Sequence, residues 1–245
     1  GLSVTDIRNL IYGSLKRLKR DRIDLMQIHW PAAGLDETRR ALDVFTELKR
    51  NSVVRNIGVC NFGVFDIVET ADYPIISNQL PYGLLWRVIE KEIAPACKAN
   101  GQRILSYATL QQGLLSGKHR SLESFPEGRK RTRHFLTPDG SLYRLTDSTL
   151  RDLHTFAADC CTSLAKIALA FSLSREFINT VIIGARTQEQ LQQILEAQKL
   201  QLSGEDLKNL ESITEPLKSK LGGNPDMFKD ESRVRYNNEN GDPVR

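Results

Sequence analysis

Four polar side chains stand at or just past the ends of short apolar runs, where an active site would need them. They are His29, Asn61, Gln79 and Tyr107. An amide such as that of Asn61 or Gln79 offers both a donor and an acceptor, so it can pair with another amide. Residues at the carboxyl ends of parallel strands face the active site of a (β/α)8 barrel, and an open doubly wound sheet shares this property. The spacing therefore predicts that these side chains line a site.

The apolar runs alternate with helical periods, which predicts βα units and a parallel sheet. Ser3 can cap a first helix, with Asp6 as its partner in a capping box. A loop that contains Gly, Pro and basic residues is predicted over residues 110–147. The strands are predicted at residues 23–28, 54–59, 75–79, 103–107 and 180–183, and the later helices at about 36–50, 64–70, 86–99, in two stretches before residue 180, from about 187, and from 203.

The fold class that this alternation predicts is α/β. The pattern alone fits either a (β/α)8 TIM-type barrel or an open doubly wound sheet, and the absence of G-x-G-x-x-G after the first strand favours the barrel. Five βα units can be counted where eight are needed, so we expect three units, or about 90 residues, to be missing from this chain. A five-stranded remnant would leave two unpaired sheet edges, which indicates a partial chain or a missing part supplied by a partner. We expect one domain over residues 1–245, with an extended tail over 222–245.

Composition and charge narrow the class of protein. Hydrophobic residues make up 40% and charged residues 26%, with a net charge of +4, which is ordinary for a globular protein. The densest basic stretch, Arg129 to Arg133, has no interleaved aromatics, so we expect a solvated loop and no nucleic-acid partner. No apolar run approaches the roughly 20 residues that cross a membrane, and the N-terminus has no signal pattern.

Four cysteines are present: Cys60, Cys97, Cys160 and Cys161. They form no CxxC pair and no Cys/His ligand spacing, so we expect no metal site and reduced thiols in a cytoplasmic protein. The adjacent pair Cys160–Cys161 falls in a helical pattern, which predicts that both pack as small apolar residues.

Five segments, in order along the chain, resemble the aldo-keto reductase family, and their long-loop form resembles its bacterial and potassium-channel-β-like members. The resemblance covers roughly residues 7–197, and the order of all five segments makes it specific. It implies an enzyme that reduces aldehydes or ketones by hydride transfer from a nicotinamide cofactor. The segments are 24–31 (DLMQIHWP), 55–62 (RNIGVCNF), 78–85 (NQLPYGLL), 106–118 (SYATLQQGLLSGK) and 181–191 (VIIGARTQEQL).

In this reaction the carbonyl oxygen becomes negative in the transition state, so it needs hydrogen-bond donors and an acid of matched pKa. The resemblance implies a Tyr acid, tuned by a Lys and an Asp, and a His that orients the carbonyl. Only the His has a match in this chain, at His29. A core histidine satisfied by backbone is the alternative for His29. The other three lie upstream in the family, and we assign their roles to no residue of this chain.

The resemblance also implies cofactor contacts. Asn61 and Gln79 match the residues that hold the nicotinamide carboxamide, and Tyr107 matches the aromatic residue that stacks on the ring. Polar strand ends and a core tyrosine are the alternatives. Cys60 stands where the family usually has Ser, so one hydrogen bond is weakened.

Two loops match the family's phosphate-binding segments. Glycine lets backbone donors approach an anion, and a helix N-terminus attracts phosphate. In the family, basic and polar side chains of the second loop bind an adenosine 2′-phosphate. Where an Arg is common in the family this chain has Gln190, and the nearby Arg186 can compensate for it. We therefore expect NADP (NADPH) rather than NAD. The matching residues are Gly113, Leu114, Ser116 and Lys118 in the first loop, and Gly184, Ala185, Arg186, Thr187 and Gln190 in the second.

Three functions fit these observations. The first is an NADP-dependent carbonyl reductase of which this is a partial chain, with a small-molecule carbonyl compound as substrate. The second is a catalytically inactive nicotinamide-binding or regulatory protein, which the unmatched Tyr, Lys and Asp favour for this chain. The third is an unstable fragment. The sequence predicts neither the particular carbonyl substrate nor the oligomeric state.

Overall fold

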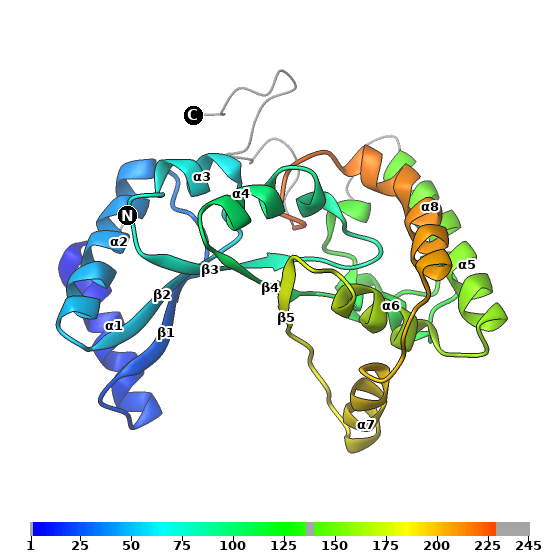
Figure 1. The fold of residues 1–245 in the computed structure, drawn as a ribbon, viewed down its shortest axis with the longest axis horizontal. Coiled ribbons are helices and arrows are strands. Elements are labelled where there is room, and N and C mark those ends of the chain that lie inside the picture. The colour runs from blue at the N-terminus through cyan, green and yellow to red at the C-terminus, as the bar shows by residue number, and fades with distance from the viewer. Residues whose placement is uncertain (1, 136–139, 229–245) are drawn as a thin grey trace. The chain divides into compact units, whose positions relative to one another are not determined.

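The computed structural model describes residues 2–135 and 140–228. It has an α/β fold whose five strands follow one another in the sheet in the order β1-β2-β3-β4-β5 (Figure 1). The pairings of β1 with β2 and of β2 with β3 are parallel. This is the predicted βα alternation, as an incomplete barrel of five strands. The strands are β1 (Ile23–Ile28), β2 (Val54–Cys60), β3 (Ile75–Pro81), β4 (Arg103–Tyr107) and β5 (Ile178–Val181).

The chain divides into two compact units. Unit 1 contains residues 2–80 and 92–104, and unit 2 contains residues 81–91, 105–135 and 140–228 of the described chain. The predicted tail lies partly outside the described residues, which end at residue 228. The prediction of one domain over residues 1–245 stays a prediction.

Unit 1 is built from β1, β2, most of β3 and four helices. The helix α1 (Val4–Leu18) begins at Ser3, whose side chain accepts from the backbone N–H of Asp6, so the predicted capping box is confirmed. Next along the chain, α2 (Leu35–Arg50) buries its apolar face. The short helices α3 (Val64–Glu69) and α4 (Ile93–Ala99) pack against each other. The core formed by α2 and β2 contains Leu42, Phe45, Leu48, Val54, Ile57 and Val59.

Strand register in unit 1 aligns three residues across the sheet. Gln27 on β1 pairs with Gly58 on β2, and Gly58 pairs with Ser77 on β3. Two residues further on, Cys60 pairs with Gln79. A Cβ atom on Gly58 would lie only 2.5 Å from the Ser77 hydroxyl oxygen. Glycine therefore keeps this point of the sheet clear of side-chain atoms from β2.

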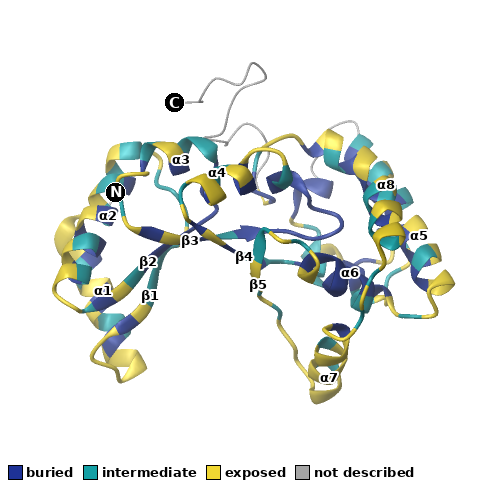
Figure 2. Ribbon diagram, viewed as in Figure 1, coloured by how far each residue is buried: buried dark blue, intermediate teal, exposed yellow. Residues whose placement is uncertain are grey.

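Unit 2 contains the second half of β4, β5 and most of the helices. The helix α5 packs against α8, and α6 packs against α7, against β5 and against the 3-10 segment η2. Figure 2 shows the contrast between α6, which is mostly buried, and α7, which is mostly exposed. The elements are η1 (Val88–Glu90), η2 (Gln111–Ser116), η3 (Glu127–Arg129), η4 (Arg133–Phe135), α5 (Ser141–Asp159), α6 (Leu164–Leu173), α7 (Gln188–Ala197) and α8 (Gly204–Leu221).

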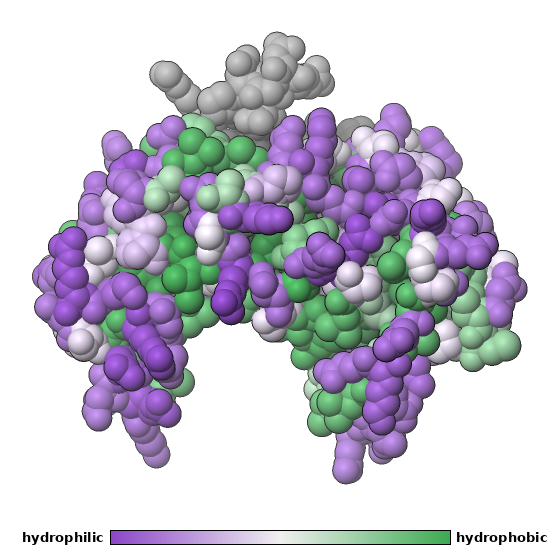
Figure 3. All heavy atoms as spheres, viewed as in Figure 1, coloured by the Kyte–Doolittle hydropathy of each residue, from purple (hydrophilic) through white to green (hydrophobic). Residues whose placement is uncertain are grey.

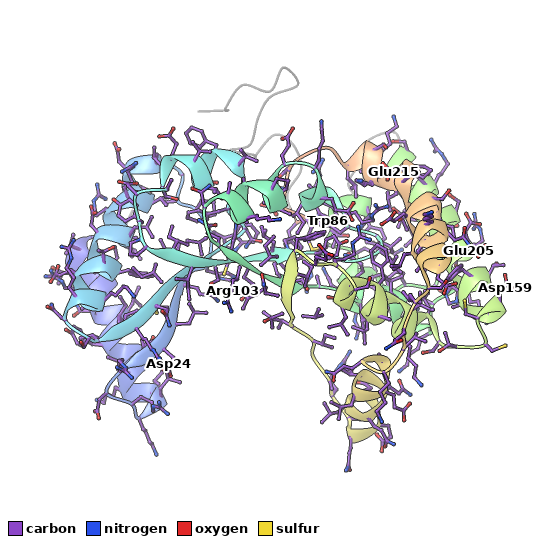
Figure 4. All side chains as sticks on the ribbon, in the orientation of Figure 1. Asp24, Trp86, Arg103, Asp159, Glu205 and Glu215 are labelled. Carbon is purple, nitrogen blue, oxygen red and sulfur yellow. The ribbon has the colours of Figure 1, made fainter. Side chains whose placement is uncertain are left out.

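A buried ionic network fastens the segment 81–91 to α8 within unit 2. Arg87, whose side chain is 4% exposed, makes two hydrogen bonds of 2.8 Å to the Glu90 carboxylate. The same guanidinium donates to the Thr214 hydroxyl at 2.9 Å, and it lies 3.5 Å from Glu215. Glu215 lies on α8, where Figure 4 labels it. Tyr82 also donates to Glu90 at 2.8 Å. Burial raises the pKa of Glu90, but the Arg87 hydrogen bond and charge outweigh burial and lower it.

A second buried polar cluster corrects one prediction. The basic run was expected to be a solvated loop, but its last residue, Arg133, and the adjacent His134 are buried against Trp86. The His134 ring nitrogen Nδ1 lies 3.1 Å from the Thr146 hydroxyl of α5. Burial, and then the charge of Arg133, lower the pKa of His134 to about 3. His134 is therefore neutral at ordinary pH.

Several predicted boundaries are also wrong. The helix expected over residues 86–99 is η1 followed by α4, and Trp86 is a fully buried residue before η1. The loop expected over 110–147 holds three 3-10 segments, and α5 already begins at Ser141. The fifth strand lies two residues earlier than expected. Cys160 and Cys161 are exposed at the end of α5, so the expectation that they pack as apolar residues is wrong.

The first helix and α7 each carry large exposed apolar side chains. On α1 these include Leu10, Tyr12 and Leu18, and on α7 they are Leu191 and Leu195. Figure 3 shows hydrophobic side chains among hydrophilic ones on the surface of α7. Among the described residues no single helix is long and apolar enough to cross a membrane. The helices α5 and α6, which are bent relative to each other, reach that length and apolar composition only when they are taken together.

Candidate functional site

Unit 1 brings three of the predicted residues together at the ends of β1, β2 and β3. Asn61 follows β2 with a left-handed φ of 60° and is 2% exposed. Its backbone N–H donates to the carbonyl oxygen of Gln79 at 2.9 Å, and its side-chain Nδ2 donates to the carbonyl oxygen of His29 at 3.2 Å. Asn61 thus ties the end of β1 to β3. Asn tolerates this backbone conformation better than most residues because its short polar side chain bonds locally.

His29 occupies the position directly after β1. Its backbone is held by Asn61, while the residue is exposed and its ring lies 6.0 Å from the Trp30 ring, centroid to centroid. The alternative of a buried core histidine is therefore excluded. Because its backbone is held and its ring is exposed, the imidazole can form a hydrogen bond with a ligand.

Gln79 has a partner that the sequence did not reveal. The Gln27 side chain on β1 donates from Nε2 to Gln79 Oε1 at 3.1 Å. It passes over Gly58, because the two glutamines lie on strands that are separated by β2. The sequence signal for Gln27 was its place in β1 two residues before His29, at the spacing of side chains that share one face of a strand.

This group of side chains fits a polar ligand. Gln27 Oε1 and the Ser77 hydroxyl oxygen are buried and have no hydrogen-bond partner among the described residues. Buried polar atoms are normally satisfied by protein, water or a ligand. The Gln79 side chain is only half-buried, and its amide suits another amide, such as a carboxamide.

Cys60 ends β2 where the family usually has Ser. The thiol is buried, and burial raises its pKa to about 11. Cys60 is therefore a protonated thiol at ordinary pH, and a thiol is a much weaker hydrogen-bond donor than a hydroxyl. The expected loss of one hydrogen bond at Cys60 stays a prediction.

In unit 2, Tyr107 ends β4 and is half-buried. Its carbonyl oxygen accepts from the backbone N–H of Tyr82 at 3.1 Å. One residue earlier, the Ser106 carbonyl accepts from the Ile182 N–H at 2.7 Å. These bonds fix the end of β4 beside the chain that follows β5, so the backbone of Tyr107 is held in place.

The first predicted phosphate-binding loop follows Tyr107 and has an unusual backbone. Within η2, Gln111, Gln112 and Gly113 all have positive φ, and Gly117 follows with a φ of 84°. Leu114 is buried and anchors the loop, Gly113 and Ser116 are half-buried, and Lys118 is exposed. Some N–H groups of this run already have partners, because Gln111 donates to the Ala108 carbonyl at 2.7 Å and Gly113 donates to the Leu110 carbonyl at 2.9 Å.

The second loop is exposed, and its own side chains accept hydrogen bonds from backbone N–H groups at the start of α7. Thr187 caps α7 by accepting from the Gln190 N–H at 3.3 Å, and Gln190 Oε1 accepts from the Arg186 N–H at 2.8 Å. A hydrogen bond from its own backbone N–H, then one from Thr187, lower the pKa of Glu189. Gly184, Ala185, Arg186 and Thr187 are all exposed. The chain's own side chains thus occupy the donors that a phosphate would use.

The predicted residues therefore fall into two groups. His29, Asn61 and Gln79 lie in unit 1, and the remaining predicted residues, from Tyr107 onward, lie in unit 2. In the part of the chain that the structure describes, no group of three or more His, Cys, Asp or Glu side chains could hold a metal ion.

Comparison with known proteins decides the family. The model of the aldo/keto reductase family matches residues 1–215. The chain belongs to this family. It is similar to the protein tas of Escherichia coli K12, with 31% identity over 233 residues, which cover 85% of this chain and 66% of that protein. It is also similar to the NADH-specific methylglyoxal reductase of Escherichia coli K12, with 28% identity over 219 residues, which cover 88% of this chain and 66% of that enzyme.

Solved structures show the same fold. The thermostable aldo-keto reductase Tm1743, solved with the inhibitor epalrestat, matches with a TM-score of 0.65 and 26% identity over 86% of this chain and 67% of that one. The glycerol dehydrogenase AKR11B4 from Gluconobacter oxydans matches with a TM-score of 0.72 and 24% identity over 93% and 68%. The predicted family and barrel-type fold are therefore confirmed. The chain spans about two thirds of the length of these relatives, in line with its five strands.

Proposed function

We propose that this chain is the nicotinamide-binding part of an aldo-keto reductase that reduces an aldehyde or ketone with NADPH. One observation carries the proposal: Asn61 is hydrogen-bonded to both His29 and Gln79 at the ends of three adjacent strands. The match to the reductase family over residues 1–215 supports it.

Each residue has a separate task in this proposal. A bound nicotinamide would supply the hydride. Asn61 and Gln79 would hold its carboxamide with their amide groups, and the family resemblance implies that Tyr107 would stack on the ring. His29 would donate a hydrogen bond to the carbonyl oxygen of the substrate, where negative charge develops. The Tyr, Lys and Asp of the family match no residue of this chain, so the acid that protonates the oxygen would come from residues outside 1–245.

The cofactor in this proposal is NADPH rather than NADH. Lys118 and the backbone donors near Gly113, Leu114 and Ser116 would hold the pyrophosphate. Arg186 would hold the 2′-phosphate, because a guanidinium pairs well with phosphate. Gly184, Ala185, Thr187 and Gln190 would supply polar and backbone contacts at the start of α7. The methylglyoxal reductase relative is specific for NADH by its name, so the two cofactors must be compared directly. Arg186→Ala should weaken NADPH binding and leave NADH binding unchanged, and equal effects on both would contradict this assignment.

Titration of NADPH fluorescence tests the binding part of the proposal. The chain should change NADPH emission at micromolar cofactor, and Gln79→Ala should weaken the affinity. Gln201→Ala, in the exposed connection between α7 and α8, is the matched control and should change nothing. An unchanged affinity in Gln79→Ala would contradict the placement of the nicotinamide.

A second function is a nicotinamide-binding or regulatory protein without catalysis. The unmatched Tyr, Lys and Asp favour it. The mass of the protein from its natural source separates the two functions: a mass about 10 kDa above the 27.7 kDa of this chain would fit three further βα units of about 30 residues each. In such a protein His29→Ala should lower turnover more than cofactor affinity. A mass equal to that of this chain, with NADPH binding but no aldehyde-dependent turnover, would favour the binding protein.

A further inference from the structure

We propose that Gln27 is a positioning residue that orients the amide of Gln79, so that Gln79 presents its Nε2 donor to the oxygen of the bound carboxamide. The inference rests on the proposed function, because it concerns the nicotinamide end of the same site. Neither the sequence motifs nor the family match assigns a role to Gln27.

The geometry of unit 1 makes this contact specific. Gln27 and Gln79 lie on β1 and β3, two strand spacings apart, or roughly 10 Å between strand axes. Their side chains still meet, with 3.1 Å between Gln27 Nε2 and Gln79 Oε1. The contact crosses β2 at Gly58, where a Cβ atom would lie 3.1 Å from Gln27 Cγ and 3.2 Å from Gln27 Oε1. Any other residue at this position would place its Cβ atom against the Gln27 side chain.

The polarity of the contact decides what Gln79 can offer. An amide can turn over and exchange its donor and acceptor ends, so a partner is needed to fix one orientation. Gln79 uses Oε1 to accept from Gln27, which leaves its NH2 group as the end that can donate to a ligand. A carboxamide oxygen requires a donor of this kind.

The oxygen end of the Gln27 amide lies near the Ser77 hydroxyl. Its Oε1 and the Ser77 hydroxyl oxygen both lie within 3.2 Å of the point that a Cβ on Gly58 would occupy. Both atoms are buried and lack a partner among the described residues. The hydrogen bond that holds the Gln27 amide is therefore the one from its Nε2 to Gln79 Oε1.

Two variants test the proposal with different chemistry. Gln27→Leu removes the hydrogen bond and should weaken NADPH binding by roughly 3- to 10-fold, which is the value of one hydrogen bond. Gln27→Glu can only accept at ordinary pH, so it should turn the Gln79 amide over and weaken binding by at least about 10-fold. Gln102→Leu replaces another buried glutamine of unit 1 and should leave NADPH affinity unchanged.

The readout compares NADPH with adenosine 2′,5′-bisphosphate, which lacks the nicotinamide. Only NADPH binding should fall in the two Gln27 variants, and circular dichroism should confirm that each variant is folded. Equal losses for both ligands would mean that Gln27 is merely structural, and unchanged NADPH affinity would overturn its positioning role. If the unaltered chain bound neither ligand, the proposed function itself would fail, which is a distinct result.

Discussion

The predicted site residues at the strand ends of unit 1 are held by hydrogen bonds, whereas several of those in the loops of unit 2 are exposed. Asn61 and Gln79 are held by hydrogen bonds to neighbouring strands. Arg186 and Lys118 stand on exposed segments, and the start of α7 is satisfied by Thr187 and Gln190. Under the proposed function, the first group would already be arranged for a ligand, whereas the second would have to exchange internal hydrogen bonds for ligand contacts.

This difference indicates where specificity and where adaptability reside. Side chains fixed by packing and by a second layer of hydrogen bonds hold a ligand group in one geometry. Exposed loop segments give up less structure when they rearrange, because few buried contacts restrain them. We therefore expect the nicotinamide end to be rigid before binding and the phosphate end to become ordered on binding.

The contrast between fixed strand ends in unit 1 and exposed loops in unit 2 requires that the core of unit 2 is itself stable. Arg87→Met tests this because it leaves Glu90 buried without its guanidinium partner. Because Lys218 still lies 3.0 Å from Glu90, the free energy of unfolding should fall by about 3 kcal/mol, the lower end of the loss for a broken buried pair, measured by urea denaturation. Arg8→Met, at the exposed Arg8–Glu47 pair, should lower it by about 0–1 kcal/mol. Similar small losses in both variants would show that the Arg87 network does not hold unit 2.

Lowering the pH should decrease the stability of the folded chain through His134, which is buried in unit 2. Its pKa in the folded chain is about 3, and that of an unfolded histidine is about 6.5. Between these values the unfolded chain binds a proton that the folded chain does not, so stability falls as the pH falls. The loss should reach about 2.5 kcal/mol between pH 6 and pH 4.

His134→Gln removes this titration, and urea denaturation from pH 8 to pH 4 measures it. The variant should show a shallower loss of stability below pH 6 than the unaltered chain. Above pH 7.5 the difference between the two proteins should stay constant. Parallel curves through the whole range would contradict a neutral buried His134.

Two glycines sharpen the comparison between the regions. Gly58→Ala places a Cβ 2.5 Å from the Ser77 hydroxyl oxygen, whereas a Cβ on Gly184 meets nothing within 4 Å. Gly58→Ala should lower the free energy of unfolding by about 1–3 kcal/mol, and Gly184→Ala should change it by about 0.5 kcal/mol or less. Thermal and urea denaturation compare them, and equal effects would mean that the strand ends are as loosely packed as the loop.

The smallest effect should come from the cap of α7. Thr187→Ala removes the acceptor for the Gln190 N–H and should cost about 1 kcal/mol. Because α7 buries only Ala197, we expect faster amide hydrogen exchange in α7 and little change elsewhere. Exchange that increased equally in α6 would show that the loop and the core are one cooperative unit.

The sequence predicted the features that depend on local pattern. The strand ends at His29, Asn61 and Gln79 follow from short apolar runs, and the Ser3 cap follows from a local spacing of polar residues. The family segments then assigned tasks to these positions. Boundaries were less predictable: Pro95 lacks an N–H and clashes one turn back, so the helix expected from residue 86 can begin only near Ile93.

The features that the sequence missed depend on partners far away in the chain. Gln27 lies in an apolar strand, and its role appears only when the register sets it beside Gly58 and Gln79. A run of arginines predicts solvent exposure, yet His134 is buried because Trp86 and Thr146 supply contacts from distant segments. No local pattern encodes such contacts.

The placement of the cysteines gives the chain a built-in chemical reporter. Cys60 and Cys97 are buried, and burial raises the pKa of each to about 11, whereas Cys160 and Cys161 are exposed. A maleimide should therefore add to two sites in the folded chain and to four after unfolding. Mass spectrometry of the labelled protein would then count folded molecules directly, without a cofactor or a substrate.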